Sequence, residues 1–198
     1  MIAAVVPAAG LSTRMGRPKL LLEIGGQAVI TRVVGALRDG GVDAVVVVVS
    51  PPEQEGAERL ARVAAEAGAI VEVLPSPTTD MRATIEQGIA RLDRLAPAGV
   101  LIVPGDSVGL CGPLVAEVIA RFRSDPSRIV VPVREGRRGH PLALPWREAL
   151  AIAHLPPGVG VNALLQSRSV LVDPVEVSGA GHDADLDTPA DYRRWSGA

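Results

Sequence analysis

The sequence has few of the features that mark a membrane, secreted or nucleic-acid-binding protein. Its single cysteine, Cys111, excludes an internal disulfide and a zinc site built from cysteines. The longest apolar run in the body of the chain, Ala44–Val49, is far shorter than the ~20 residues of a membrane helix. No charged segment precedes the apolar N-terminal run, so we expect no signal peptide and a cytoplasmic location. The formal net charge of -2 gives no general attraction to nucleic acid or to an anionic membrane.

Three common ligand-binding motifs are also missing. A Walker A loop needs glycine, four residues and then Gly-Lys-Ser/Thr, whereas no Gly-Lys pair follows Gly10 at that spacing. The dinucleotide fingerprint Gly-x-Gly-x-x-Gly is absent as well, which argues against a hydride-transfer enzyme. An EF-hand loop from Asp183 is excluded, because Thr188 and Arg194 occupy the places of its glycine and glutamate.

Strand-like and helix-like segments alternate along the chain, a pattern typical of an α/β fold with a largely parallel sheet. The expected strands are Ile2–Val6, Ala44–Val49, Ile70–Leu74, Val100–Val103 and Ile129–Val133. The expected helices are Val29–Arg38, Glu58–Ala67, one within Thr78–Leu95, Pro113–Phe122, one opened by Gly158–Leu165, and one at the C-terminus. The length and the 47% hydrophobic content suit one compact unit, so we expect residues 1–198 to form a single domain.

The segment after the first strand is rich in residues that bind phosphate. Gly10 lacks a Cβ, so the backbone there can turn tightly and approach a ligand, and the N–H groups of residues 11–13 could converge on an anion. Arg14 offers a planar fork for phosphate oxygens, and Lys19 offers a compact point charge. The loop also stands at the carboxyl end of a strand, where open α/β sheets bind ligands. It suits a nucleoside triphosphate; a structural turn is the alternative.

The order of residues in this loop resembles the signature of a known family. The run from Ala8 to Lys19, Ala-Ala-Gly-Leu-Ser-Thr-Arg-Met-Gly-Arg-Pro-Lys, is similar to that of the nucleotidyltransferases related to the molybdenum cofactor enzymes, particularly the cytidylyltransferase branch. The resemblance implies a three-layer α/β/α, Rossmann-like nucleotidyltransferase (GT-A-like) domain with a mostly parallel sheet. It also implies that the triphosphate is held by Ala8, Ala9, Gly10, Leu11, Ser12, Arg14 and Lys19.

The start of the helix expected within Thr78–Leu95 forms a second part of this site. Thr79 or Asp80 could cap the helix. In the resembled family a Gly-Met-Ser-rich segment opens this helix and contacts the nucleotide, and Met81 and Thr84 are the matching residues here. Asp80 replaces the family's glycine and would repel phosphate, so we interpret it as a helix cap.

A carboxylate follows the expected strand Val100–Val103. Magnesium is typically held by one or two carboxylates plus substrate phosphates, so Asp106, facing the triphosphate loop, suits a metal ligand. The family has Gly-Asp-Gln-Pro or a close variant here, with the aspartate on the metal. This chain keeps Gly-Asp and departs from the pattern at Ser107 and Val108. The alternative is a turn aspartate that caps local N–H groups.

Alternating carboxylates precede the C-terminal helix. If Asp183–Asp187 is extended, Asp185 and Asp187 point the same way. The family's Asp-x-Asp-Thr-Pro-x-Asp motif matches from Asp185 to Asp191, which implies Asp187 as the second magnesium ligand, with Asp185 in reserve. Asp187 could instead be the cap of the C-terminal helix.

The turn expected at Gly136–Leu142 carries two arginines and a histidine. It resembles the family's Arg-Gly-His-Pro segment, found where the acceptor substrate lies, so Arg138 and His140 are candidates for acceptor binding. A purely structural histidine beside a proline is the alternative.

The glycines of Gly158–Leu165 could let the N-terminus of the next helix approach an anion.

The resemblance implies an enzyme that transfers CMP from CTP to a molybdopterin-type molybdenum cofactor and releases pyrophosphate, with Mg²⁺ as cofactor. Arg14, Lys19 and Asp106 would be its catalytic residues, acting by positioning and charge stabilisation. The Ala-Ala-Gly opening resembles the cytidylyl branch more than the Leu-Ala-Gly-Gly opening of the guanylyl branch. Guanylyl or other nucleotidyl transfer to a different small phosphate acceptor is an alternative, and so is a nucleotide-binding regulatory protein with little transfer activity. A partner oxidoreductase could bind transiently.

Overall fold

The strands and helices follow one another in the alternating order expected from the sequence. The computed structural model describes residues 1–78, 80–156, 158–177, 181 and 184–197. The strands are β1 (Ile2–Pro7), β2 (Glu23–Ile24), β3 (Gln27–Ala28), β4 (Ala44–Val49), β5 (Ile70–Val73), β6 (Gly99–Ile102), β7 (Ile129–Arg134), β8 (Arg137–Arg138), β9 (Leu142–Pro145) and β10 (Val172–Glu176). The helices are α1 (Val29–Asp39), α2 (Ala57–Glu66), α3 (Met81–Leu92), α4 (Gly112–Ser124), α5 (Trp146–Leu150), α6 (Val161–Ser167) and α7 (Pro189–Ser196).

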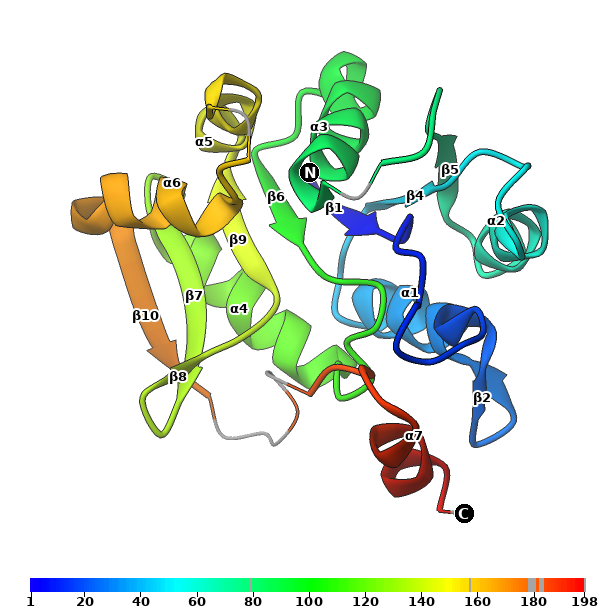
Figure 1. The fold of residues 1–198 in the computed structure, drawn as a ribbon. Helices are drawn as coiled ribbons and strands as arrows, with labels where there is room; N and C mark the ends of the chain where they lie inside the picture. The colour runs from blue at the N-terminus through cyan, green and yellow to red at the C-terminus, as the bar shows by residue number, and fades with distance from the viewer. Residues whose placement is uncertain (79, 157, 178–180, 182–183, 198) are drawn as a thin grey trace.

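A mostly parallel sheet lies between two layers of helices (Figure 1). Its strand order is β10-β7-β9-β6-β1-β4-β5, with β8 paired to β7. β1 pairs in parallel with β4 and β6, and β4 pairs in parallel with β5. β9 is antiparallel to both β6 and β7. The fold class expected from the sequence, a three-layer α/β/α domain with a mostly parallel sheet, is confirmed.

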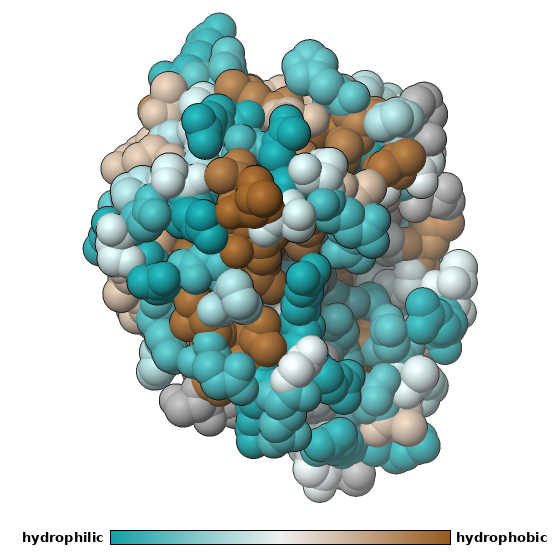
Figure 2. Space-filling model, turned by 90° about the vertical axis from the view of Figure 1, so that its left-hand side faces the viewer, coloured by the Kyte–Doolittle hydropathy of each residue, from teal (hydrophilic) through white to brown (hydrophobic). Residues whose placement is uncertain are grey.

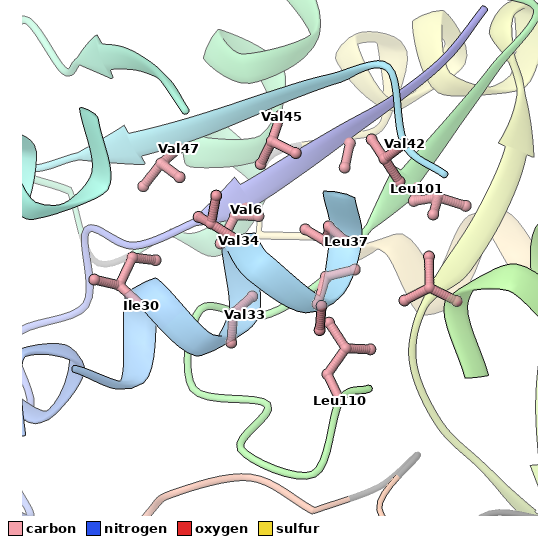
Figure 3. Packing of buried hydrophobic residues seen from close by; sticks show 14 of the residues in the cluster. Val6, Ile30, Val33, Val34, Leu37, Val42, Val45, Val47, Leu101 and Leu110 are labelled. Carbon is pink, nitrogen blue, oxygen red and sulfur yellow. The ribbon is translucent and has the colours of Figure 1, made fainter. Parts of the chain in front are cut away.

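The two faces of the sheet are buried under different helices. Alternate side chains of a strand point to opposite faces, so Ala4 and Val6 of β1 pack toward α1 and α4, while Ala3 and Val5 pack toward α3. Figure 3 shows the first of these cores, in which side chains of α1 meet β1 and β4. Because both faces are covered, the strands need unbroken apolar runs such as Ala44–Val49.

The expected segments match most of the observed elements. All five expected strands are present within one or two residues of their predicted ends. The helix expected to open at Gly158 begins later, at Val161, and the stretch after Gly136–Leu142 contains β9 and α5, which the sequence did not predict. β10 was not predicted either. Among the described residues, no helix is both long and apolar enough to cross a lipid bilayer.

Gly88→Ala in α3 is expected to lower the free energy of unfolding by about 1–3 kcal/mol. A Cβ at Gly88 would overlap the side chain of Val5, so α3 could no longer lie close against β1. Gly35→Ala in α1 is the matched control, because nothing lies within 4 Å of a Cβ there. Removing this helical glycine should raise the free energy of unfolding by about 0.5–1 kcal/mol. Urea denaturation measures both variants, and a shift of the same sign in both would contradict the close approach of α3 to β1.

Candidate active site

The predicted triphosphate loop follows β1 and Asp106 follows β6, at the carboxyl edge of the three neighbouring parallel strands β6, β1 and β4. The Ala8 N–H, just after β1, donates to the carbonyl of Val48 in β4 at 2.8 Å. The Gly105 N–H, after β6, donates to the carbonyl of Pro7 at 3.2 Å. The Ser50 hydroxyl, after β4, donates to the carbonyl of Ala9 at 3.0 Å. These bonds fasten the start of the predicted triphosphate loop to both neighbouring strand ends.

The left-handed positions of this loop follow Gly10. The loop residues with positive φ are Ser12 (52°) and Gly16 (63°), and Gly10 is not among them. The Met15 N–H donates to the Ser12 carbonyl at 2.9 Å and closes a turn between the two. A Cβ at Gly10 would meet nothing within 4 Å, so this position keeps open space beside the loop. The Ser12 hydroxyl accepts a hydrogen bond from the Lys19 N–H at 3.2 Å and ties the two ends of the loop together.

Two cations and two carboxylates of the predicted site form one cluster. The Lys19 ammonium forms an ion pair with Asp106 and donates to Asp187 at 3.2 Å. Arg14 donates to the other oxygen of Asp187 at 3.1 Å. The side chains of Lys19 and Asp106 are each 16% exposed, whereas that of Arg14 is 71% exposed. The Lys19–Asp106 pair is therefore shielded from water, while the Arg14–Asp187 pair is largely screened by solvent.

The C-terminal segment brings Asp187 into this cluster. The Leu186 N–H donates to the backbone carbonyl of Asp106 at 3.0 Å, and the Leu186 side chain is fully buried. In Figure 1 this segment accordingly runs beside the loop that follows β6. Thr188 caps α7 through a capping box with Asp191, so the hypothesis that Asp187 is the helix cap is wrong. Asp183 lies outside the described residues.

The clustered charges shift the pKa values of two of these side chains. Burial alone would lower the pKa of Lys19, but Asp106 and then Asp187 outweigh it and raise that pKa, so Lys19 carries its proton at neutral pH. Burial raises the pKa of Asp185, and the charge of Asp106 raises it further, while His140 opposes the shift. Asp185 also accepts a hydrogen bond from the Ser107 hydroxyl at 3.0 Å. Asp106 thus interacts both with the cation of Lys19 and with the carboxyl group of Asp185.

A cavity of about 320 Å³ opens between the predicted triphosphate loop and the start of α3. It has the size of a small-molecule pocket. Its lining includes the predicted residues Ala8, Ala9, Gly10, Leu11, Ser12, Lys19, Met81, Thr84 and Asp106. Asp80 also lines it and caps α3, accepting from the Arg82 N–H at 2.9 Å, as we interpreted it. Thr79, the other cap candidate, lies outside the described residues.

The two predicted acceptor residues lie at a separate hollow. Arg138 and His140 line a space of about 440 Å³ bounded by β7, β9 and α6. The hollow also contains Asn162 and Gln166, which the sequence did not point to as site residues.

Another contact that the sequence did not predict anchors the triphosphate loop: the guanidinium of Arg17 lies 5.2 Å from the ring centroid of Tyr192 in α7.

The donor set at the cluster fits a divalent cation that takes oxygen ligands. Asp106 and Asp187 supply two carboxylates on either side of Lys19. In the part of the chain that the structure describes, no group of three or more His, Cys, Asp or Glu side chains is placed to hold a metal ion. Two carboxylates completed by substrate phosphates are the set that Mg²⁺ commonly uses.

The sequence is similar to proteins of one enzyme class. Residues 4–172 match the family described as MobA-like NTP transferase domain. The chain is 30% identical over 193 residues to the 2-C-methyl-D-erythritol 4-phosphate cytidylyltransferase of Rhodococcus jostii (strain RHA1), over 91% of this chain and 80% of that protein. It is 33% identical over 150 residues to the molybdenum cofactor guanylyltransferase of Rhizobium meliloti (strain 1021), over 75% of this chain and 64% of that protein.

Solved structures share the fold along its whole length. Rv0371c from Mycobacterium tuberculosis H37Rv matches with a TM-score of 0.85 at 25% identity, over 100% of this chain and 99% of that chain. Rv0371C in complex with manganese matches with a TM-score of 0.80 at 25% identity, over 100% of this chain and 98% of that one. Because the family match spans most of the sequence and the fold agrees, the chain belongs to the MobA-like NTP transferase family and is a nucleotidyltransferase.

Proposed function

We propose that this chain transfers CMP from CTP to a molybdopterin-type molybdenum cofactor and releases pyrophosphate, with Mg²⁺ as cofactor. The observation that carries the proposal is the position of Lys19, which contacts both Asp106 and Asp187 at the edge of the cavity. Lys19 can bind negatively charged groups of a ligand, and the two carboxylates can bind a cation that accompanies that ligand. A nucleoside triphosphate with a divalent cation is such a ligand.

Each charged residue has a role in this reaction. Lys19 and Arg14 turn to the triphosphate and neutralise charge on its oxygens. Asp106 and Asp187 hold Mg²⁺, which supplies further positive charge to the phosphates when bound. A phosphate oxygen of the acceptor forms a bond to the α-phosphorus, and the bond from the α-phosphorus to pyrophosphate breaks with its electron pair on the leaving group. Positioning and charge stabilisation are sufficient, so no protein nucleophile is needed.

The choice of CTP rests on two observations. The Ala8-Ala9-Gly10 opening is similar to that of cytidylyltransferases, and the alignment that spans 91% of the chain is with a cytidylyltransferase. Ala8, Ala9 and Gly10 line the cavity together with Met81 and Thr84, so these residues are assigned to nucleotide binding. The relative from Rhizobium meliloti, a guanylyltransferase, supports GTP as the alternative.

The acceptor has two candidates. The Rhizobium relative favours the molybdenum cofactor, with Arg138 and His140 in contact with it. The Rhodococcus relative acts on a polyol phosphate, and cytidylyl transfer to such a phosphate is the second candidate. The chain departs from the family pattern at Asp80 and after Asp106, which leaves a nucleotide-binding regulator as a further alternative.

Thermal melting with CTP, GTP, ATP and UTP, each with and without Mg²⁺, tests the nucleotide. A ligand at 100 times its dissociation constant stabilises a protein by about 2.7 kcal/mol. For a chain of this length that corresponds to a rise of roughly 5–10 °C in the melting temperature. We expect this rise with CTP and Mg²⁺ together. Selectivity for GTP would move the assignment to guanylyl transfer, and no rise with any nucleotide would refute it.

Pyrophosphate release tests the acceptor. With CTP and Mg²⁺, we expect release to depend on added molybdopterin-type cofactor and not on 2-C-methyl-D-erythritol 4-phosphate. Release that needs the polyol phosphate instead would establish the second candidate. Nucleotide binding without release in the presence of either acceptor would support the regulatory alternative.

A further inference from the structure

The hollow that contains Arg138 and His140 has an apolar floor and a polar rim. The floor consists of Val131 in β7, Leu142 in β9 and Leu165 in α6, each no more than 6% exposed. None of the described residues that line it is Phe, Tyr or Trp. Its volume of about 440 Å³ falls in the range of small-molecule pockets, about 300–1,000 Å³. The face of the molecule that carries α6 and β10 shows apolar patches set among hydrophilic surface (Figure 2).

Two amides from α6 stand on the rim of this hollow. Asn162 and Gln166 are four residues apart in the helix, so their side chains lie on the same face of it. Both residues are exposed, and neither side chain forms a hydrogen bond with another residue in the described parts of the chain. Each amide offers two N–H donors and a carbonyl acceptor. The rim therefore presents donors and acceptors that no group within the described ranges occupies.

The hollow adjoins the carboxylate side of the catalytic cluster. His140 and Leu142 line it, and Leu142 pairs with Ile102 of β6, the strand that leads into Asp106. Arg138 adds an exposed cation at the same rim. A molecule seated in the hollow can thus extend a phosphate toward the cluster while its other end rests on α6.

The lining favours a flat heterocycle over a sugar. A polyol carries hydroxyl groups all round, and several would lie against aliphatic side chains without a hydrogen-bond partner, which costs free energy. A fused nitrogen heterocycle has apolar faces and puts its donors and acceptors at its edge. Such a ring can lie on Val131, Leu142 and Leu165 while its edge meets Asn162 and Gln166.

We propose that Asn162 and Gln166 are specificity-determining residues that bind the edge of a nitrogen-rich fused ring in the acceptor. The inference rests on the proposed function, since it assumes that the hollow receives the acceptor. It makes α6 the element that separates a pterin-type acceptor from a sugar or polyol phosphate.

Titration of the fluorescent probe pterin-6-carboxylic acid tests the proposal. We expect Asn162→Leu and Gln166→Met to raise its dissociation constant by about 3–10-fold each, the loss of one or two hydrogen bonds. Gln87→Met is the matched control, because Gln87 is an exposed glutamine of α3 that lines none of these cavities. This control should stay within about twofold of the unaltered protein. The melting shift with CTP and Mg²⁺ should be the same in all three variants.

The outcomes separate this inference from the proposed function. Equal binding of the probe to the unaltered protein and to both α6 variants would overturn the inference, and so would displacement by ribose 5-phosphate at comparable affinity. If CTP binds but the pterin probe does not, the inference fails while nucleotidyl transfer stands. If the probe binds in an amide-dependent way but pyrophosphate is never released, the acceptor site stands while the proposed transfer fails.

Discussion

Asp106→Asn is expected to lower metal-dependent pyrophosphate release by about 10²–10³-fold. The asparagine side chain keeps the size of aspartate but removes one of the two carboxylates that flank Lys19. The site then holds a divalent cation less tightly, and charge that develops on the phosphates is less well neutralised. Initial rates over a range of Mg²⁺ concentrations measure the effect, which should persist at saturating metal.

Asp93→Asn is the matched control for this variant. Asp93 lies in the short 3-10 helix after α3, is exposed, and lines neither the cavity beside the triphosphate loop nor the hollow that contains Arg138 and His140. Its rate should stay within about twofold of the unaltered protein, as is usual for surface substitutions. Circular dichroism establishes that both variants are folded. A folded Asp106→Asn protein with an undiminished rate would exclude Asp106 from metal binding and leave its ion pair with Lys19 as a structural contact.

The central strands and the convergence of the site could be predicted from the sequence. Strands such as Ala44–Val49 are buried on both faces, so their apolar runs are unbroken and bounded by turn residues. In a mostly parallel sheet, segments that follow the strands meet at one edge. The loop follows β1 and Asp106 follows β6, so the order of the motifs along the chain predicts that the two lie near each other.

The strands β9 and β10 could not be predicted because their sequence patterns are weaker. β10 contains Asp173 and Pro174, and its burial alternates irregularly, since it lies at the edge of the sheet. Proline lacks an N–H donor and is tolerated at such an edge, where it breaks the sequence pattern of a strand. β9 is only four residues long and ends at Pro145. It is antiparallel to its neighbours, which the alternation of strands and helices does not indicate.

The pairing within the charge cluster depends on contacts between distant parts of the chain. Lys19 is 87 residues from Asp106 and 168 residues from Asp187 in sequence. Motif order indicates that these residues approach one another, but not that Lys19 lies between the two carboxylates. That arrangement requires the bond from the Leu186 N–H to the Asp106 carbonyl, which no spacing along the chain signals. Asn162 and Gln166 were not predicted for a similar reason. Their face of α6 borders a hollow because β7 and β9 lie beside it, and the sequence does not indicate that packing.

Lys19→Met is expected to change the binding of metal and of nucleotide in opposite directions. Without nucleotide, the ammonium of Lys19 competes with any cation for Asp106 and Asp187. Its removal leaves the carboxylates unneutralised, so Mn²⁺ alone should bind about tenfold more tightly. The same variant loses a charged contact to the triphosphate, so CTP with Mg²⁺ should bind about 10–100-fold more weakly. Because Lys19 is the only lysine in the sequence, no other lysine can replace its charge.

Two titrations and one control variant test this prediction. Electron paramagnetic resonance of free Mn²⁺ gives the affinity for metal alone, and calorimetry gives the affinity for CTP with Mg²⁺. Arg14→Gln should change the affinity for Mn²⁺ alone by less than about twofold, because Arg14 is mostly exposed and contacts only Asp187 in this cluster. If Lys19→Met weakens both ligands, Lys19 does not compete with the metal. If it changes neither, the cluster does not bind the triphosphate. Tighter binding of Mn²⁺ together with weaker binding of CTP would mean that metal and nucleotide bind cooperatively. The metal then frees Lys19 for the nucleotide, and the nucleotide frees the two carboxylates for the metal.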